Sequence, residues 1–233
     1  MYYKIIDNQN VTANSTVQAT LKNAVIDTII IGFTQSNDTN KLTLSNLDSC
    51  KFQLIKRSVK DDKVIVNCRI SDILRYTDIN GGNYSDTNGT YLQGFLDVGD
   101  IAIGLEDEIV ANVQIGNITL DKVPKVFVFA YRASKKVSNV ISFESFALNG
   151  SASFKNVISI INFTDAAGND LIVTDNSLKQ VIVNDKLGTM VLNTLTFLET
   201  NKPWSLIYSN DDANDITIQS QASVNLFIKK VLE

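Results

Sequence analysis

A repeated pattern of apolar segments constrains this chain more than any other feature. Lys22-Asn23 leads into an apolar run that ends at Phe33-Thr34, and Lys155-Asn156 leads into a similar run that ends at Phe163-Thr164. The Lys-Asn pairs are 133 positions apart and the Phe-Thr pairs are 130 positions apart. Chance similarity between apolar runs is the alternative, but a matched order of segments favours a duplicated domain.

Two more pairs of segments extend the repeat. Residues 41–46 correspond to residues 170–175, and each is expected to form a short second strand. Runs at 126–132 and 224–230, which are 98 positions apart, close the two copies. Because the offset falls from 133 to 98, the first copy must contain an insertion. The stretch 70–94 fits that insertion, since it carries a helical pattern followed by a Gly- and Asn-rich loop.

The local pattern is that of an all-β chain. Apolar runs rich in Val, Ile, Thr and Phe are separated by clusters of Asn, Asp, Ser and Gly, as in strands joined by turns. One helical turn is expected at 71–76, with Ser71 as its N-cap. The clearest predicted strands are residues 28–33, 63–68, 125–131, 157–163 and 224–231.

The repeat also predicts the domain organisation. We expect a first domain at 1–135, with an insertion near 70–94, and a second domain at 136–233; the boundary falls in a polar stretch. Each domain has about seven to nine candidate strands, which suits an eight-stranded jelly roll or a comparable β-sandwich. The predicted fold is therefore two tandem jelly-roll barrels.

The composition argues against an enzyme and against a nucleic-acid-binding protein. The chain has no histidine, which excludes the common Ser-His-Asp and Cys-His catalytic groups and most zinc sites. It also lacks the glycine motifs of phosphate-binding loops. With a net charge of −4, we expect no sequence-specific nucleic-acid partner. A glycosidase-type pair of carboxylates is the remaining enzymatic alternative.

The cysteines and the acidic clusters are only weak indications of a disulfide and of a calcium site. Cys50 and Cys68 are 18 residues apart, and buried thiols are preferred over a disulfide. The start of the chain is too polar for a secretory signal, so we expect assembly in a reducing cytoplasm. Structural calcium between subunits is an alternative to solvated turn residues at the acidic clusters. These clusters are Asp61-Asp62, Glu106-Asp107-Glu108 and Asp211-Asp212.

The loop at 78–94 is the candidate surface-contact site. It contains four glycines and the side chains of Tyr84, Asp86 and Tyr91. Such a loop can adapt its shape to a binding partner. The alternative is a mobile surface loop that binds no partner. We expect no catalytic, cofactor-binding or metal-binding residues.

The chain resembles the double-jelly-roll major capsid proteins of tailless icosahedral viruses. In length it is similar to the corticovirus-like bacteriophage coat proteins. The resemblance rests on residues 14–21 leading into 25–30, on the equivalent opening of the second copy, and on the run that closes each copy. It implies a virion protein assembled in the host cytoplasm. It also implies a homotrimer whose six barrels fill a pseudo-hexagonal position in the shell, with other capsid proteins such as a vertex protein and an internal membrane as partners.

Aromatic residues outside the alternating core pattern are candidates for the seams between barrels. They are Tyr2, Tyr3, Tyr131 and Trp204, and ordinary core packing is the alternative for Trp204. The competing function is a phage spike, a receptor-binding protein or another β-sandwich protein that binds a surface. Such a protein would bind a carbohydrate or a protein instead of forming a shell.

Overall fold

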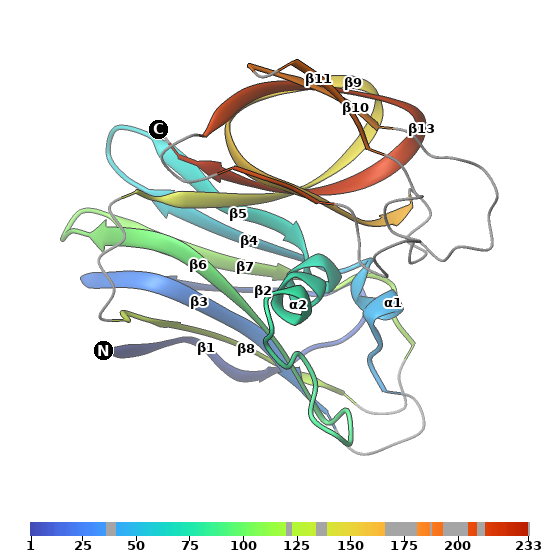
Figure 1. Ribbon diagram of the computed structural model, residues 1–233. Helices are drawn as coiled ribbons and strands as arrows, with labels where there is room; N and C mark the ends of the chain where they lie inside the picture. Colours follow the sequence, from blue (N-terminus) through green and yellow to red (C-terminus); the bar gives the residue numbers. More distant parts are fainter. Residues whose placement is uncertain are drawn as a thin grey trace. The chain divides into compact units, whose positions relative to one another are not determined.

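The computed structural model describes residues 1–35, 41–119, 123–133, 139–165, 181–186, 188–192, 205–208 and 213–232. The chain divides into two compact units, Met1–Ser142 and Phe143–Glu233 (Figure 1). The first unit thus extends a few residues past the domain boundary expected at 135. Strands dominate both units, so the chain is all-β, and two helices occur among the described residues.

The first unit consists of two four-stranded antiparallel sheets. In spatial order, one sheet contains β1 (Tyr2–Asn10), β8 (Lys125–Tyr131), β3 (Ala24–Thr34) and β6 (Tyr91–Ile103). The other contains β2 (Thr16–Leu21), β7 (Glu108–Gln114), β4 (Lys51–Arg57) and β5 (Asp62–Arg69). The first strand pairs with the eighth and the second with the seventh, which is the connectivity of an eight-stranded jelly roll.

The core of the first unit lies between its two sheets. Ile29, Ile31 and Phe33 alternate along β3 and are fully buried, as are Phe52 and Leu54 on β4. Because successive side chains of a strand point to opposite faces, this alternation means that each sheet buries one face against the other.

A short helix, α1 (Leu44–Leu47), connects β3 to β4. The strand expected at residues 41–46 is therefore wrong. The Thr43 hydroxyl accepts a hydrogen bond from the Asn46 backbone N–H at 3.3 Å, and the Asn46 side chain accepts one from the Thr43 backbone N–H at 3.0 Å. This capping box satisfies the free N–H groups of a helix start, so the segment folds as a helical turn. Its expected counterpart at residues 170–175 lies outside the described residues.

The second helix, α2 (Ile70–Ile79), connects β5 to β6 and confirms the helix expected at 71–76. The expected cap is wrong, because Arg69 occupies the N-cap position without a side-chain cap bond. Ser71 is fully buried inside the helix, and its hydroxyl donates instead to Asp48. Neither helix of the described chain is long and apolar enough to cross a bilayer.

The described part of the second unit contains two long strands and three short ones. They are β9 (Ile141–Asp165), β10 (Val181–Asp185), β11 (Gly188–Leu192), β12 (Ser205–Ile207) and β13 (Asn214–Val231). β10 pairs with β11 and with the first part of β13, while β12 pairs with the later part of β9. Its core contains Leu148, Phe154 and Val157 of β9 together with Val183 and Ile218.

The strand pairs of the second unit repeat those of the first. The pairs β10–β11, β10–β13 and β12–β9 correspond to β4–β5, β4–β7 and β6–β3. By this correspondence, β9 continues through the positions of β1, β2 and β3, and β13 continues through those of β7 and β8. Both units therefore have jelly-roll connectivity, and the five strands predicted from the sequence are confirmed within β3, β5, β8, β9 and β13.

The two units differ in length at several connections. β11 begins 126 residues after β5, β12 begins 114 residues after β6, and β13 begins 106 residues after β7. The largest decrease in this offset, from 126 to 114 residues, falls between the fifth strand and the sixth. There the first unit has α2 and residues 80–90.

Candidate assembly surfaces

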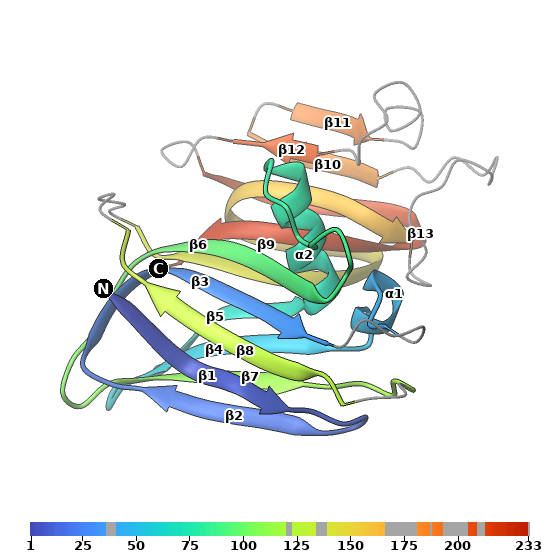
Figure 2. The same cartoon turned by 90° about the horizontal axis from the view of Figure 1, so that it is seen from below.

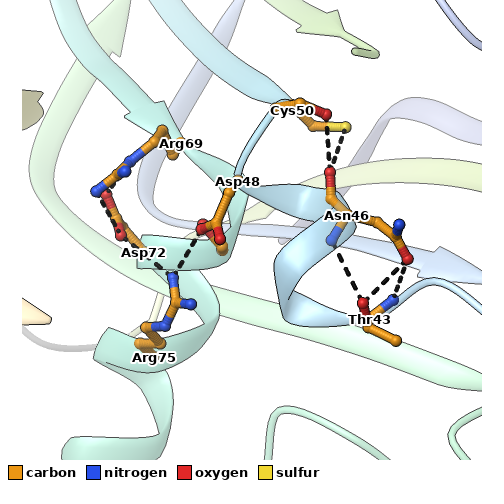
Figure 3. Close-up of polar contacts among 9 residues, drawn as sticks. Thr43, Asn46, Asp48, Cys50, Arg69, Asp72 and Arg75 are labelled. Carbon is orange, nitrogen blue, oxygen red and sulfur yellow. Dashed lines mark hydrogen bonds and ion pairs between the residues drawn. The ribbon is translucent and has the colours of Figure 1, made fainter. Parts of the chain in front are cut away.

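A buried polar cluster joins the two helices of the first unit (Figure 3). Arg69 donates to both carboxylate oxygens of Asp72, at 2.9 and 3.2 Å. Arg75 Nη1 donates to Asp48 Oδ1 at 2.9 Å and lies 3.6 Å from Asp72 Oδ1. Asp72 is fully buried, and Asp48 directly follows α1. The cluster therefore fixes α2 against the end of α1.

The helix α2 also packs against the edge strand β6. The Thr77 hydroxyl accepts a hydrogen bond from the Phe95 backbone N–H at 2.9 Å. A Cβ atom at Gly94 would lie 2.7 Å from Cγ2 of Ile73, so only glycine permits this close approach. Burial raises the pKa of Tyr76, and the charge of Asp97 raises it further. Because α2 covers this part of the β6 edge, the edge is protected from pairing with another strand.

The candidate loop is organised by its own side chains. Asp86 accepts hydrogen bonds from the Thr90 hydroxyl at 2.7 Å and from the Tyr91 backbone N–H at 2.9 Å. These hydrogen bonds hold the pKa of Asp86 below its usual value. The bond from Thr90 has the largest effect, and the bond from Tyr91 has the next largest. The carbonyl of Tyr84 accepts from the Gln93 N–H at 2.9 Å. Tyr84, Asp86 and Tyr91 are all partly buried, so they also have roles inside the unit, and their contact with a partner stays a prediction.

A row of four aromatic rings crosses one sheet of the first unit. The ring centroids are 5.2 Å apart for Tyr2 and Phe129, 4.9 Å for Phe129 and Phe127, and 5.1 Å for Phe127 and Tyr91. Gly32 makes room for this row, because a Cβ atom there would lie 2.3 Å from Cζ of Phe127. The rings of Phe127 and Tyr91 are stacked, which links the candidate loop to β8.

The structure places the expected seam residues in different environments. Tyr2 is 52% exposed, whereas Tyr3 and Tyr131 are partly buried. Tyr2 and Tyr131 are paired on neighbouring strands β1 and β8. Trp204 lies outside the described residues.

The acidic turns of the first unit contact basic side chains. Asp62 lies 3.7 Å from Arg57, and Glu108 lies 3.6 Å from both Lys22 and Arg57. Asp107 pairs with Lys56 at 3.3 Å. Within the described ranges, no three His, Cys, Asp or Glu residues are grouped as metal ligands. The Asp211-Asp212 pair lies outside these ranges, and calcium binding stays a prediction.

Cys50 and Cys68 are buried in the first unit and form no disulfide with each other. The Gly116 backbone N–H donates to the sulfur of Cys50 at 3.5 Å. Burial, the largest influence, raises the pKa of the Cys50 thiol. This supports the expectation that the cysteines act as small core residues.

No protein-family model matches this sequence, and no curated protein matches it either. Solved structures do match in shape. The major capsid protein of STIV, the Sulfolobus turreted icosahedral virus, has a TM-score of 0.63 at 11% identity over 99% of this chain and 95% of that chain. The major capsid protein P2 from bacteriophage PM2 has a TM-score of 0.55 at 8% identity, with coverages of 100% and 98%. The PBCV-1 virus capsid has a TM-score of 0.55 at 8% identity, with coverages of 99% and 92%.

These matches cover the whole chain and both of its units. At such low identity they concern the fold, which agrees with the strand connectivity described above. The chain has the double-jelly-roll fold shared by these viral capsid proteins.

Proposed function

We propose that this chain is a major capsid protein, a structural component of a tailless icosahedral virion that is assembled in the host cytoplasm. The observation that carries the proposal is the repetition of jelly-roll connectivity in two tandem units. The full-length likeness to three viral capsid structures supports it.

The working unit in this proposal is a homotrimer. Three chains with two similar units each present six similar barrels around one three-fold axis. Such a trimer fits a position with six neighbours, which a trimer of single barrels does not match. An icosahedral shell also needs five-fold vertices, where a pseudo-hexagonal trimer does not fit. A separate vertex protein is therefore the expected capsid partner.

The proposed role is structural, and the chemistry of the chain supports this. It has no histidine to serve as a general base near neutral pH. Its net charge of −4 is unsuited to neutralising a packaged genome, so an internal membrane between shell and nucleic acid is consistent with the sequence. Calcium bridging between trimers is a further option for acidic turns.

Light scattering and negative-stain microscopy of the purified chain test the proposal. We expect particles of three times the 25.7 kDa chain mass with a hexagonal outline, or closed shells. A protein that stays monomeric at all accessible concentrations overturns the proposal. A monomer that binds glycans on an array would point to a receptor-binding protein instead.

A further inference from the structure

The strands β1, β8, β3 and β6 lie side by side in one sheet (Figure 2), and their register defines which residues lie on its outer face. Ile29, Ile31 and Phe33 of β3 point into the core, so Ile30 and its cross-strand partners lie on the opposite side of the sheet. We call this side the aromatic face. Tyr2 is exposed on this face, Phe127 is buried, and the other large apolar members are partly buried: Ile30, Tyr91, Phe95, Phe129 and Tyr131.

The other sheet of the same unit has an ordinary outer face. There the Gln53 amide donates to Asn67 at 3.2 Å, and the Asn112 amide donates to Gln53 at 3.4 Å. Arg57 and Glu108 continue this face with an ion pair at 3.6 Å. An antiparallel sheet with one solvated side normally carries polar residues on that side. The aromatic face departs from this rule, although both sheets belong to one sandwich.

Charged side chains lie at the margins of the aromatic face. The register places Lys4 on β1, Lys125 at the start of β8 and Asp97 on β6. A centre rich in aromatic residues and poor in charge, surrounded by a polar rim, is the anatomy of a protein interface. A rim of both signs fits a protein partner, whereas an anionic lipid surface would favour basic residues alone.

The size of the face indicates how the partner is arranged. Four strands about 4.8 Å apart and about seven residues long give a flat footprint of roughly 400 Å². Stable association needs about 800 Å² of accessible surface from each partner. One contact through this face is therefore small for an isolated dimer. In a closed ring each copy contacts two neighbours, which doubles the buried surface for each chain.

We propose that the aromatic face is the surface through which one copy of this chain contacts the next copy in the oligomer. This inference rests on the proposed function, because it locates the contact that would hold the trimer together. The face of one copy meets a different surface of its neighbour, as a cyclic trimer requires.

Two substitutions and one matched control test this interface. Tyr2→Glu and Phe129→Glu each place a charge on the aromatic face. Val64→Glu places the same charge on an apolar residue that is 47% exposed on the other sheet. Light scattering over a dilution series should show that each face variant raises the concentration needed for half assembly at least about tenfold. The control should assemble like the unchanged chain.

Circular dichroism and thermal unfolding establish that each variant is folded. Tyr2 is 52% exposed, so Tyr2→Glu decides the question even where Phe129→Glu fails to fold. A trimer that persists with Tyr2→Glu at unchanged concentrations overturns this inference and leaves the capsid proposal intact. An unchanged chain that stays monomeric at all accessible concentrations overturns both.

Discussion

Asn23 and Asn156 adopt the same left-handed backbone conformation, with φ of 51° and 53°. Each follows a lysine and precedes the apolar segment that forms the centre of its unit. In the first unit this bend separates β2 from β3, and in the second it lies within the continuous strand β9. Asparagine tolerates positive φ better than most residues, so the repeated Lys-Asn pair encodes one bend in both units.

This relationship predicts that the two asparagines respond alike to substitution. Asn23→Gly and Asn156→Gly should leave the free energy of unfolding nearly unchanged, because glycine also accepts positive φ. Asn23→Val and Asn156→Val should each lower it by about 1–3 kcal/mol. Denaturant unfolding measures both effects. A valine variant as stable as the unchanged chain would show that the left-handed bend is not required.

The contact between α2 and β6 should depend on the absence of a side chain at Gly94. A methyl group there would meet Ile73 at 2.7 Å, so Gly94→Ala should lower the free energy of unfolding by about 1–3 kcal/mol. Gly81 is the matched control for added bulk, because a Cβ atom there meets nothing within 4 Å. Its positive φ of 78° makes the conservative control Gly81→Asn. Equal melting temperatures for the Gly94 variant and the unchanged chain would contradict this packing.

The buried Asp72 carboxylate should stabilise the first unit strongly. Asp72→Ala leaves the guanidinium groups of Arg69 and Arg75 without this partner in a buried site. Removing one partner of a buried pair costs about 3–5 kcal/mol. Chemical denaturation followed by circular dichroism gives the loss directly.

Asp62→Ala provides the control for the Asp72 experiment. Asp62 pairs with Arg57 at 3.7 Å, but its side chain is 59% exposed. An exposed pair contributes about 0–1 kcal/mol, so this variant should remain close to the unchanged chain. Similar losses for Asp62→Ala and Asp72→Ala would argue against a special role for the buried cluster.

The lowered pKa of Asp86 predicts a specific pH response of the candidate loop. The hydrogen bonds of Asp86 favour its charged form, so they are complete above the unfolded pKa of about 3.9 and are lost as the pH falls through the lower folded value. An NMR titration of the side-chain carboxyl carbon should give a midpoint below about 3.9. Thr90→Ala should move that midpoint upward, because the Thr90 hydroxyl is the largest contributor. An unchanged midpoint in this variant would contradict the hydrogen-bonded loop.

The buried thiols should resist labelling in the folded protein. Burial raises the pKa of Cys50, which lowers the fraction of reactive thiolate, and Cys68 is only 1% exposed. A thiol reagent at neutral pH should therefore react slowly with the native chain. After denaturation it should label two thiols per chain. Fewer than two reactive thiols in unreduced, denatured protein would indicate a disulfide.

Strands could be predicted where the local pattern and the global fold agree. The alternating apolar residues of β3 and the dense apolar run of β8 were recognisable because β-branched and aromatic residues favour extended, buried backbone. The candidate loop was recognisable from its glycines, but its inward-facing contacts were not. The stacking of Tyr91 on Phe127 joins residues 36 positions apart, and no local pattern reports such a distance.

The helices show the limit of sequence patterns most clearly. Residues 41–46 alternate like a strand, but the reciprocal hydrogen bonds of Thr43 and Asn46 form a helix start. Ser71 has a side chain suited to an N-cap. Its hydroxyl instead donates a hydrogen bond to Asp48, which lies 23 positions earlier in the chain. In both cases short polar side chains could form several alternative hydrogen bonds, and the folded surroundings select one.

The sequence alone determined the β class and the repeat, because these depend on residue type and short-range order. Tertiary structure decided which strands pair, how α2 closes against Gly94, and that one sheet carries aromatic residues on its outer side. These features depend on register and close approach between distant segments, since a shift of one residue would exchange the inner and outer faces of a strand.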